Sequence, residues 1–212
     1  MNDIDASLRE AERAVRDLKL KGIQIYTNMN GVPLDDPRFK PLFKVIAGYD
    51  LPVWLHCWDS PIMGPPTDQA SPQVKEWVKD PYKMMIGWDF ETSLAMVRLV
   101  NSGVFKENPD IKIITHHLGG MIPMLEGRVR NFLGESFADM KLFYNDTAVS
   151  ASVPALMCGY ALFGADRILF GTDEPFPRQA TRLAIEAIEK MPVPAAEKEK
   201  IFGENAKQLL KL

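Results

Sequence analysis

The chain has 212 residues, of which 46% are hydrophobic and 25% charged, a composition typical of one globular domain with a full core. This balance excludes a disordered or fibrous chain, and we treat residues 1–212 as a single domain. The 25 basic and 28 acidic residues give a net charge of -3 without a basic stripe, so we expect no nucleic-acid partner.

The cysteines and the apolar stretches bear on where the protein works. Cys57 and Cys158 lie far apart and form no disulfide framework, which favours a reducing compartment and predicts a cytoplasmic protein. The charged N-terminus has no apolar core of a signal peptide. The uncharged stretch 147–165 is interrupted by Ser, Pro and Gly, so we expect a buried helix there and no membrane association.

Helix and strand signals alternate along the chain. Apolar residues at three- and four-residue steps predict a helix over 4–18, and Asp36 and Pro37 begin a second one that ends near Gly48. Asp89 is expected to cap a third helix that ends near residue 101. Further helices are expected over 119–133, 154–163, 178–190 and 194–212, and short apolar runs predict strands at 23–27, 51–56, 111–115, 142–147 and 167–172.

This alternation is typical of a parallel sheet with crossover helices, so we predict an α/β protein. The strands are short apolar runs without polar alternation, as expected where both faces are buried. The pattern fits a barrel and a doubly wound sheet equally. The segment from Trp58 to Asp80, rich in Pro, Gly, Asp and Ser, is predicted to be an active-site loop or a small irregular subdomain.

Scarce polar residues stand where the predicted strands end. The sequence has three histidines: His56 ends one strand, and His116 and His117 follow another. Asp173 follows the last strand. Carboxyl ends of parallel strands gather at one rim, where imidazole and carboxylate groups can hold Zn²⁺ or a related divalent ion. For each histidine taken alone, a hydrogen-bonded structural role is the competing interpretation.

The surroundings of these residues contain motifs, such as Thr-His-His-Leu-Gly-Gly at 115–120 and Leu-Phe-Gly-Thr-Asp-Glu-Pro-Phe at 169–176. In their order and spacing they resemble the amidohydrolase-2 family, the branch of the amidohydrolase superfamily that contains aminocarboxymuconate-semialdehyde and γ-resorcylate decarboxylases. The other motifs that carry the resemblance lie at 21–27, 33–37, 54–56, 90–93, 127–129 and 203–206.

The resemblance implies a distorted (β/α)8 TIM-type barrel holding one divalent metal, zinc first and manganese second. It implies that His56 is a metal ligand on the fifth barrel strand. His117 resembles the sixth-strand histidine, an acid/base group close to the metal, and Asp173 the eighth-strand aspartate that binds the metal and takes a proton. The expected metal ligands in this chain are His56, His117 and Asp173. His116 competes with His117, because adjacent residues of a strand point to opposite faces.

The resemblance also extends to Arg128, which is similar to an arginine that reaches across a dimer interface to a substrate carboxylate. Its guanidinium suits bidentate carboxylate binding, although a surface charge is an equal alternative. We therefore expect a homodimer with a small-molecule carboxylate substrate. Cys57 is expected in the core, pointing away from the face that His56 uses. Trp58 and Trp88 either wall the pocket or pack in the core.

The sequence departs from the family at its first strand, because the family's His-x-His metal-binding pair has no counterpart. The five predicted strands correspond to barrel strands four to eight, so we expect an incomplete, N-terminally truncated barrel. We favour a fragment, or a chain begun at an internal Met. The alternatives are strand edges that pair with a second copy and a stable open half.

These expectations lead to three functional hypotheses. The first is a metal-dependent decarboxylase of an unsaturated or aromatic carboxylic acid. The second is a metal-dependent hydrolase of a lactone or amide, which would use the same residues. The third is an inactive chain that serves as a structural or interaction module. Release of CO₂, ring opening and metal content distinguish them.

Overall fold

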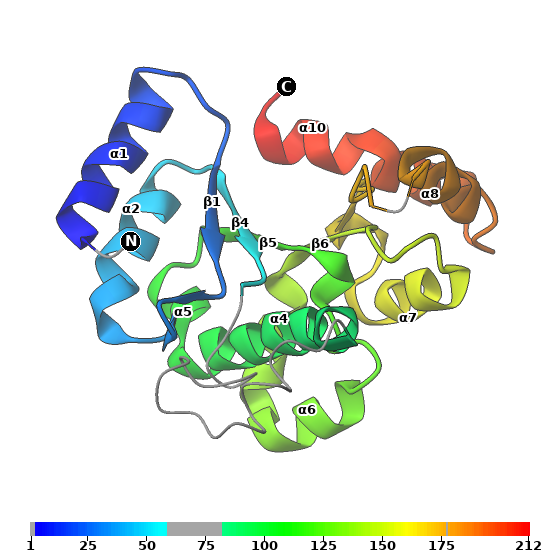
Figure 1. The fold of residues 1–212 in the computed structure, drawn as a ribbon, viewed down its shortest axis with the longest axis horizontal. Helices are drawn as coiled ribbons and strands as arrows, with labels where there is room; N and C mark the ends of the chain where they lie inside the picture. The colour runs from blue at the N-terminus through cyan, green and yellow to red at the C-terminus, as the bar shows by residue number, and fades with distance from the viewer. Residues whose placement is uncertain (1–2, 59–81, 177) are drawn as a thin grey trace.

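The structure is a computed structural model that describes residues 3–58, 82–176 and 178–212, and its helices surround a parallel sheet (Figure 1). The helices are α1 (Ile4–Arg16), α2 (Lys40–Gly48), α4 (Tyr82–Ser102), α5 (Val104–Glu107), α6 (Glu126–Leu133), α7 (Val153–Phe163), α8 (Ala180–Glu189), α9 (Ala195–Glu199) and α10 (Asn205–Leu210). Short 3-10 segments include η1 (Pro37–Phe39), η3 (His117–Gly119), η4 (Gly134–Leu142) and η5 (Ala165–Arg167), and a π-helical turn, η6, spans Lys200–Glu204. The strands are β1 (Ile23–Tyr26), β4 (Pro52–His56), β5 (Lys112–Thr115), β6 (Tyr144–Asp146) and β7 (Ile168–Leu169), with a small antiparallel pair, β2 (Asn28–Met29) and β3 (Val32–Pro33).

The order of the strands in the main sheet distinguishes a barrel from a doubly wound sheet. Its five strands lie in the order β1-β4-β5-β6-β7, and every neighbouring pair is parallel. A doubly wound sheet reverses its strand order at a switch point, whereas successive strands of a (β/α)8 barrel stay in chain order. The predicted α/β fold of barrel type is therefore confirmed, with five successive strands in the described residues.

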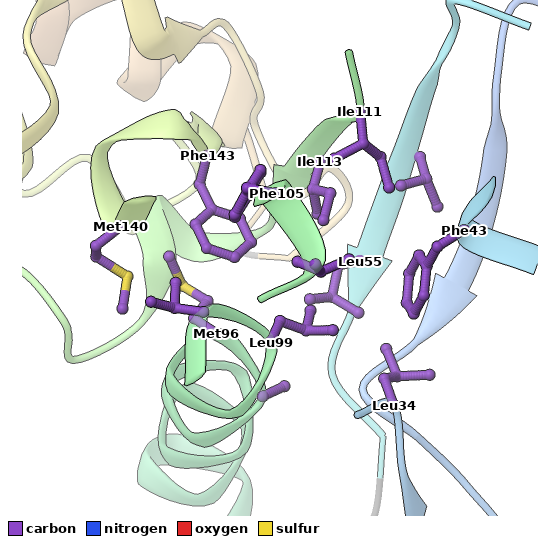
Figure 2. Close-up of a cluster of buried hydrophobic side chains, with 14 of the residues drawn as sticks. Leu34, Phe43, Leu55, Met96, Leu99, Phe105, Ile111, Ile113, Met140 and Phe143 are labelled. Carbon is purple, nitrogen blue, oxygen red and sulfur yellow. The ribbon is translucent and has the colours of Figure 1, made fainter. Parts of the chain in front are cut away.

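The main hydrophobic core lies between one face of the sheet and the helices that follow its strands. Leu55 of β4, Ile113 of β5 and Phe143, just before β6, point toward Met96 and Leu99 of α4 (Figure 2). Helix α2 adds the residues that the apolar spacing predicted, Leu42, Phe43 and Ile46, all buried. This face of the sheet is the outer, helix-covered one.

The opposite, inner face carries a second layer of side chains. Trp54, Ile114 and Tyr144 are paired across β4, β5 and β6, so they share one level. The last helix, α10, covers this level, because its Leu209 packs against Ile114 and Leu169. Ala206, Leu209 and Leu210 of α10 also line a cavity at the carboxyl ends of the strands.

Two helix predictions were wrong in detail. Asp89 does not cap a helix, because α4 begins at Tyr82 and contains it. The helix expected from Gly119 begins at Glu126, because Gly119 and Gly120 both adopt positive φ and the chain turns before it becomes helical. Of the segment from Trp58 to Asp80, only Trp58 lies within the described residues. Among the helices that the structure describes, none has the length and apolarity to cross a membrane.

Candidate active site

Polar side chains follow the apolar layer of Trp54, Ile114 and Tyr144 at the carboxyl ends of the central strands. Tyr26 and His56 are partners in the β1–β4 pair. The His116 amide donates to the Leu55 carbonyl, so the pairing of β5 with β4 continues past the last residue of β5. His56, His116 and Asp146 therefore face inward, where they line a cavity of about 340 Å³ together with Asp173.

The three imidazole rings lie together, as the strand-end positions predicted. The ring centroids of His56 and His116 are 4.8 Å apart, and those of His56 and His117 are 6.2 Å apart. The third pair, His116 and His117, is also separated by 6.2 Å. Both adjacent histidines approach His56, because His117 has φ of 54° and leaves the strand geometry in which neighbours diverge.

Each ring is held through its Nδ1 atom. Nδ1 of His56 lies 2.7 Å from the Cys57 carbonyl oxygen, and Nδ1 of His117 lies 3.0 Å from the Ala148 carbonyl oxygen. Nδ1 of His116 lies 2.9 Å from Asp146 Oδ2. Carbonyl and carboxylate oxygens only accept hydrogen bonds, so each Nδ1 donates and each neutral ring keeps its lone pair on Nε2. Metal-binding histidines are oriented in this way.

Cys57 differs from its prediction. The residue is buried as expected, but Sγ lies 3.8 Å from His56 Nδ1, and ligand atoms of His56, Cys57 and His117 lie within 4.8 Å of one another. Strand alternation fails here because β4 ends at His56. Burial, and then the charge of Asp89, raise the pKa of Cys57 to about 12. The group is therefore a neutral thiol, which is a poor metal ligand compared with an imidazole.

Asp173 joins the first cavity to a second one. It lines the inner cavity and also one of about 390 Å³ that is bordered by His117, Asp89 and Trp88. Its backbone is left-handed, with φ of 59°. The prediction that Asp173 lies beside the histidines at the rim agrees with this geometry, although its carboxylate is outside the group of ligand atoms within 4.8 Å.

The electrostatic surroundings shift the pKa values of His56 and His117 in opposite directions. Burial lowers the pKa of His56, more strongly than its hydrogen bond to the Cys57 carbonyl raises it. Burial also opposes the charged form of His117, but the charge of Asp146 and the bond to the Ala148 carbonyl outweigh it and raise that pKa. His56 is thus suited to be a neutral ligand, and His117 to carry a proton.

Arg128 lies away from both cavities. It is exposed on α6 and does not line either of them. On the same helix and the turn before it, Met124 and Phe132 have 71% and 86% of their surface exposed. A role of Arg128 in this site would therefore require a second molecule.

Two site residues were not found from the sequence. Asp146 ends β6 just as His56 ends β4, so the strand-end rule that selected the histidines could also have selected it. Asp89 lies inside α4 and borders the second cavity, a position that sequence periodicity does not reveal. Burial raises the pKa of Asp89, and the charge of the neighbouring His117 partly offsets this increase.

Comparison with known proteins places this site in a family. The sequence profile described as amidohydrolase matches residues 1–212, the whole chain. The chain belongs to the amidohydrolase family. The family assignment made from motifs is thereby confirmed.

The curated relatives of this amidohydrolase include decarboxylases. A 2-amino-3-carboxymuconate-6-semialdehyde decarboxylase of Dictyostelium discoideum is 29% identical over 100% of the chain and 59% of its own length. A gamma-resorcylate decarboxylase of Polaromonas sp. is 30% identical over 100% of the chain and 68% of its own length. The chain therefore spans about six to seven tenths of these relatives.

Solved structures give the same result for the fold of the amidohydrolase. A 2,6-dihydroxybenzoate decarboxylase in complex with 2,6-dihydroxybenzoate superposes with a TM-score of 0.82 at 26% identity, covering 100% of this chain and 68% of its own. A dihydroxybenzoic acid decarboxylase of Polaromonas sp. with bound manganese and 2-nitroresorcinol gives a TM-score of 0.81 at 26% identity, covering 99% of this chain and 66% of its own.

Proposed function

We propose that the protein is a metal-dependent decarboxylase that removes CO₂ from an aromatic or unsaturated carboxylic acid. The observation that carries this proposal is the group of three imidazoles in an amidohydrolase fold, each fixed through Nδ1, of which His56 and His116 line the inner cavity and His117 the second one. Its named relatives among curated proteins and solved structures decarboxylate acids of this class.

The metal would be held by His56, His117 and Asp173. The donor set fits a divalent ion, because the Nδ1 contacts of the two histidines leave their Nε2 lone pairs available and Asp173 borders both cavities. Imidazole favours zinc over manganese in affinity, whereas a similar structure holds manganese, so either ion suits the proposal. Bound there, the ion would polarise a carboxylate or hydroxyl oxygen of the substrate.

The chain's own residues would handle the proton. When the bond between the ring carbon and the carboxylate breaks, its electron pair stays on the carbon, which then takes a proton as CO₂ leaves. His117 would have one role at a time: a neutral ring would help to hold the ion, whereas a protonated ring, which its raised pKa favours, would donate the proton to the carbon while His56 and Asp173 hold the ion. Asp173 acts as the base that receives a proton from a substrate hydroxyl or water at the same site.

The proposal includes a homodimer in which Arg128 of a second copy binds the substrate carboxylate. Arg128 lies four residues after Met124 and four before Phe132, so it shares a face with these two large exposed apolar side chains. Phe132→Asp is expected to shift the protein to monomers in sedimentation velocity. Leu18→Asp, at an exposed leucine outside α6, is the control. An unchanged dimer, or a monomeric wild type, would refute this part.

The decisive experiment measures metal content and CO₂ release on untagged protein prepared without chelators. We expect near one equivalent of zinc or manganese per chain by plasma mass spectrometry, and CO₂ from hydroxylated benzoic acids but no ring opening of lactones. His56→Ala should lose the metal, while Glu204→Gln, an exposed substitution that lines neither cavity, should keep it. Absence of metal would favour the inactive module, and lactone opening without CO₂ would favour the hydrolase.

We also propose that the protein works in the cytoplasm. Cys57 and Cys158 are both free thiols, which suits the reducing environment of the cytoplasm.

A further inference from the structure

Asp146 makes several contacts within the site, although none of the roles proposed above involves it. It ends β6, its side chain is 11% exposed, and both of its oxygens are engaged. Oδ1 accepts hydrogen bonds from the His117 and Ala148 amides at 2.9 and 3.0 Å. Oδ2 lies 2.9 Å from Nδ1 of His116. One carboxylate therefore contacts both adjacent histidines.

The Oδ1 contacts hold His117 from two sides. The carboxylate binds the His117 amide in its left-handed conformation, while Ala148, whose own amide Asp146 also binds, accepts from the His117 ring. Asp146 and Ala148 thus hold the backbone and the ring of His117 together.

The Oδ2 contact decides which nitrogen of His116 carries the lone pair. An ionised carboxylate only accepts, so Nδ1 must donate and Nε2 of the neutral ring is an acceptor. That Nε2 atom is buried and has no hydrogen-bond partner among the residues that the structure describes. A buried acceptor without a partner is unfavourable, and a ligand bound to this Nε2 atom would remove that cost.

We propose that His116 is a further ligand of a divalent cation in this site and that Asp146 is the residue that positions it. Of the three ring pairs, His116 and His56 are the closest, and both residues line the inner cavity. A carboxylate that accepts from Nδ1 of a histidine is the common outer partner of a metal-bound imidazole. This inference deepens the proposed function and rests on its metal site.

The variant Asp146→Asn tests the contact of Oδ2 while it keeps the contacts of Oδ1. The amide oxygen still accepts from the His117 and Ala148 amides, but the NH₂ group can only donate toward His116 Nδ1. The neutral ring must then place its hydrogen on Nε2, which removes the lone pair offered to the cation. Two-bond ¹⁵N–¹H spectra of metal-free protein should show Nδ1 protonated in the wild type and Nε2 protonated in the variant.

Titration with Mn²⁺, followed by the signal of the free ion in electron paramagnetic resonance, gives the second readout. We expect Asp146→Asn to weaken binding by about 10- to 100-fold, as loss of an outer partner of a metal ligand does. His116→Ala should weaken it at least as much, and the double variant should be no weaker than His116→Ala alone. Asp166→Asn, at an exposed carboxylate paired with Lys200, is the control.

The outcomes are distinct. Equal Mn²⁺ affinity in wild type and His116→Ala overturns this inference and leaves the proposed function intact, as does an unchanged tautomer in Asp146→Asn. A wild type that binds no Mn²⁺ or Zn²⁺ overturns both. Far-ultraviolet circular dichroism establishes that each variant is folded before titration.

Discussion

The side chains of His56 and Cys57 are neighbours in the site, and their chemistry differs because of their surroundings. The imidazole donates to a carbonyl and keeps a free lone pair, whereas the thiol is buried near carboxylates. Burial and these charges together raise the pKa of Cys57 to about 12, so at pH 8 only about one thiol in ten thousand is ionised.

Cys57 is therefore expected to resist alkylation in the native protein. At pH 8, iodoacetamide should modify the partly exposed Cys158 and leave Cys57 unmodified, as measured by peptide mass spectrometry. In urea, both should react at similar rates, because burial and the charged neighbours are lost. Native labelling of Cys57 as fast as of Cys158 would show that its sulfur is ionised or accessible.

At the scale of elements, the turn after β5 must fit closely against α4. Gly120 has φ of 61° and ψ of -123°, and a Cβ there would overlap the carbonyl oxygen of Asp89. The Met121 amide also donates to Ser93 Oγ on the same helix. The position of His117 relative to α4 thus depends on a residue without a side chain.

Gly120→Ala is expected to lower the free energy of unfolding more than Gly134→Ala. Gly134 has nearly the same backbone, with φ of 57° and ψ of -130°, but open space around it. Backbone strain should therefore be similar in both variants, about 1–3 kcal/mol, and close approach should add about 1–3 kcal/mol at Gly120. Urea denaturation measures both values, and equal losses would mean that the turn can move away from α4.

Helix α10 is expected to stabilise the inner face of the sheet. Leu209→Ala removes a side chain that packs on Ile114 and Leu169, which should lower the free energy of unfolding by about 2–5 kcal/mol. Leu212→Ala, at a leucine that is 77% exposed, should change it by less than about 0.5 kcal/mol. Urea denaturation of the two variants tests this, and similar values would mean that α10 does not cover the sheet in solution.

At the scale of the whole molecule, Asp50 connects distant parts of the chain. It lies between α2 and β4 and forms ion pairs with Lys112 at the start of β5 and with Lys211, 2.6 Å away, after α10. Hydrogen bonds from these two lysines lower the pKa of Asp50 from 3.8 to about 2. A lowered carboxyl pKa stabilises the fold above its unfolded value and ceases to do so as the pH falls.

Asp50→Asn should therefore destabilise the protein at pH 7, and the difference from the wild type should vanish between pH 4 and 2. The side chain is 52% exposed, so screening limits the effect to about 0.5 kcal/mol, less at high salt. Thermal unfolding at a series of pH values measures it. Asp110→Asn, at an exposed aspartate near the same edge, is the comparison, and an effect that persists below pH 2 would contradict the assignment.

The sequence predicts the sheet well because local apolar runs coincide with its strands. The runs at 23–27, 51–56 and 111–115 became β1, β4 and β5 with small shifts at their ends. The last run was overextended: β7 contains only Ile168 and Leu169, because the chain then leaves the sheet toward Asp173. Strand order, which separates a barrel from a doubly wound sheet, depends on long-range pairing, so the apolar runs could not predict it and only the family resemblance did.

The site was predicted as far as strand ends identify it. That rule predicted that His56, His117 and Asp173 lie at one rim, where the structure places them, while their roles stay predictions. It could not choose between His116 and His117, because alternation applies only within a strand. The left-handed turn at His117 brings both rings toward His56. Asp89 enters the site from the middle of a helix, which requires tertiary packing.

The left-handed backbone of His117 and Asp173 has a consequence for how the protein can evolve. Each position is unfavourable by about 1 kcal/mol for a residue with a side chain, and glycine would relieve that strain. Selection for heat resistance alone would therefore favour glycine at the two places that the proposed chemistry needs most. Retention of His117 and Asp173 under such selection would reveal pressure to keep the activity.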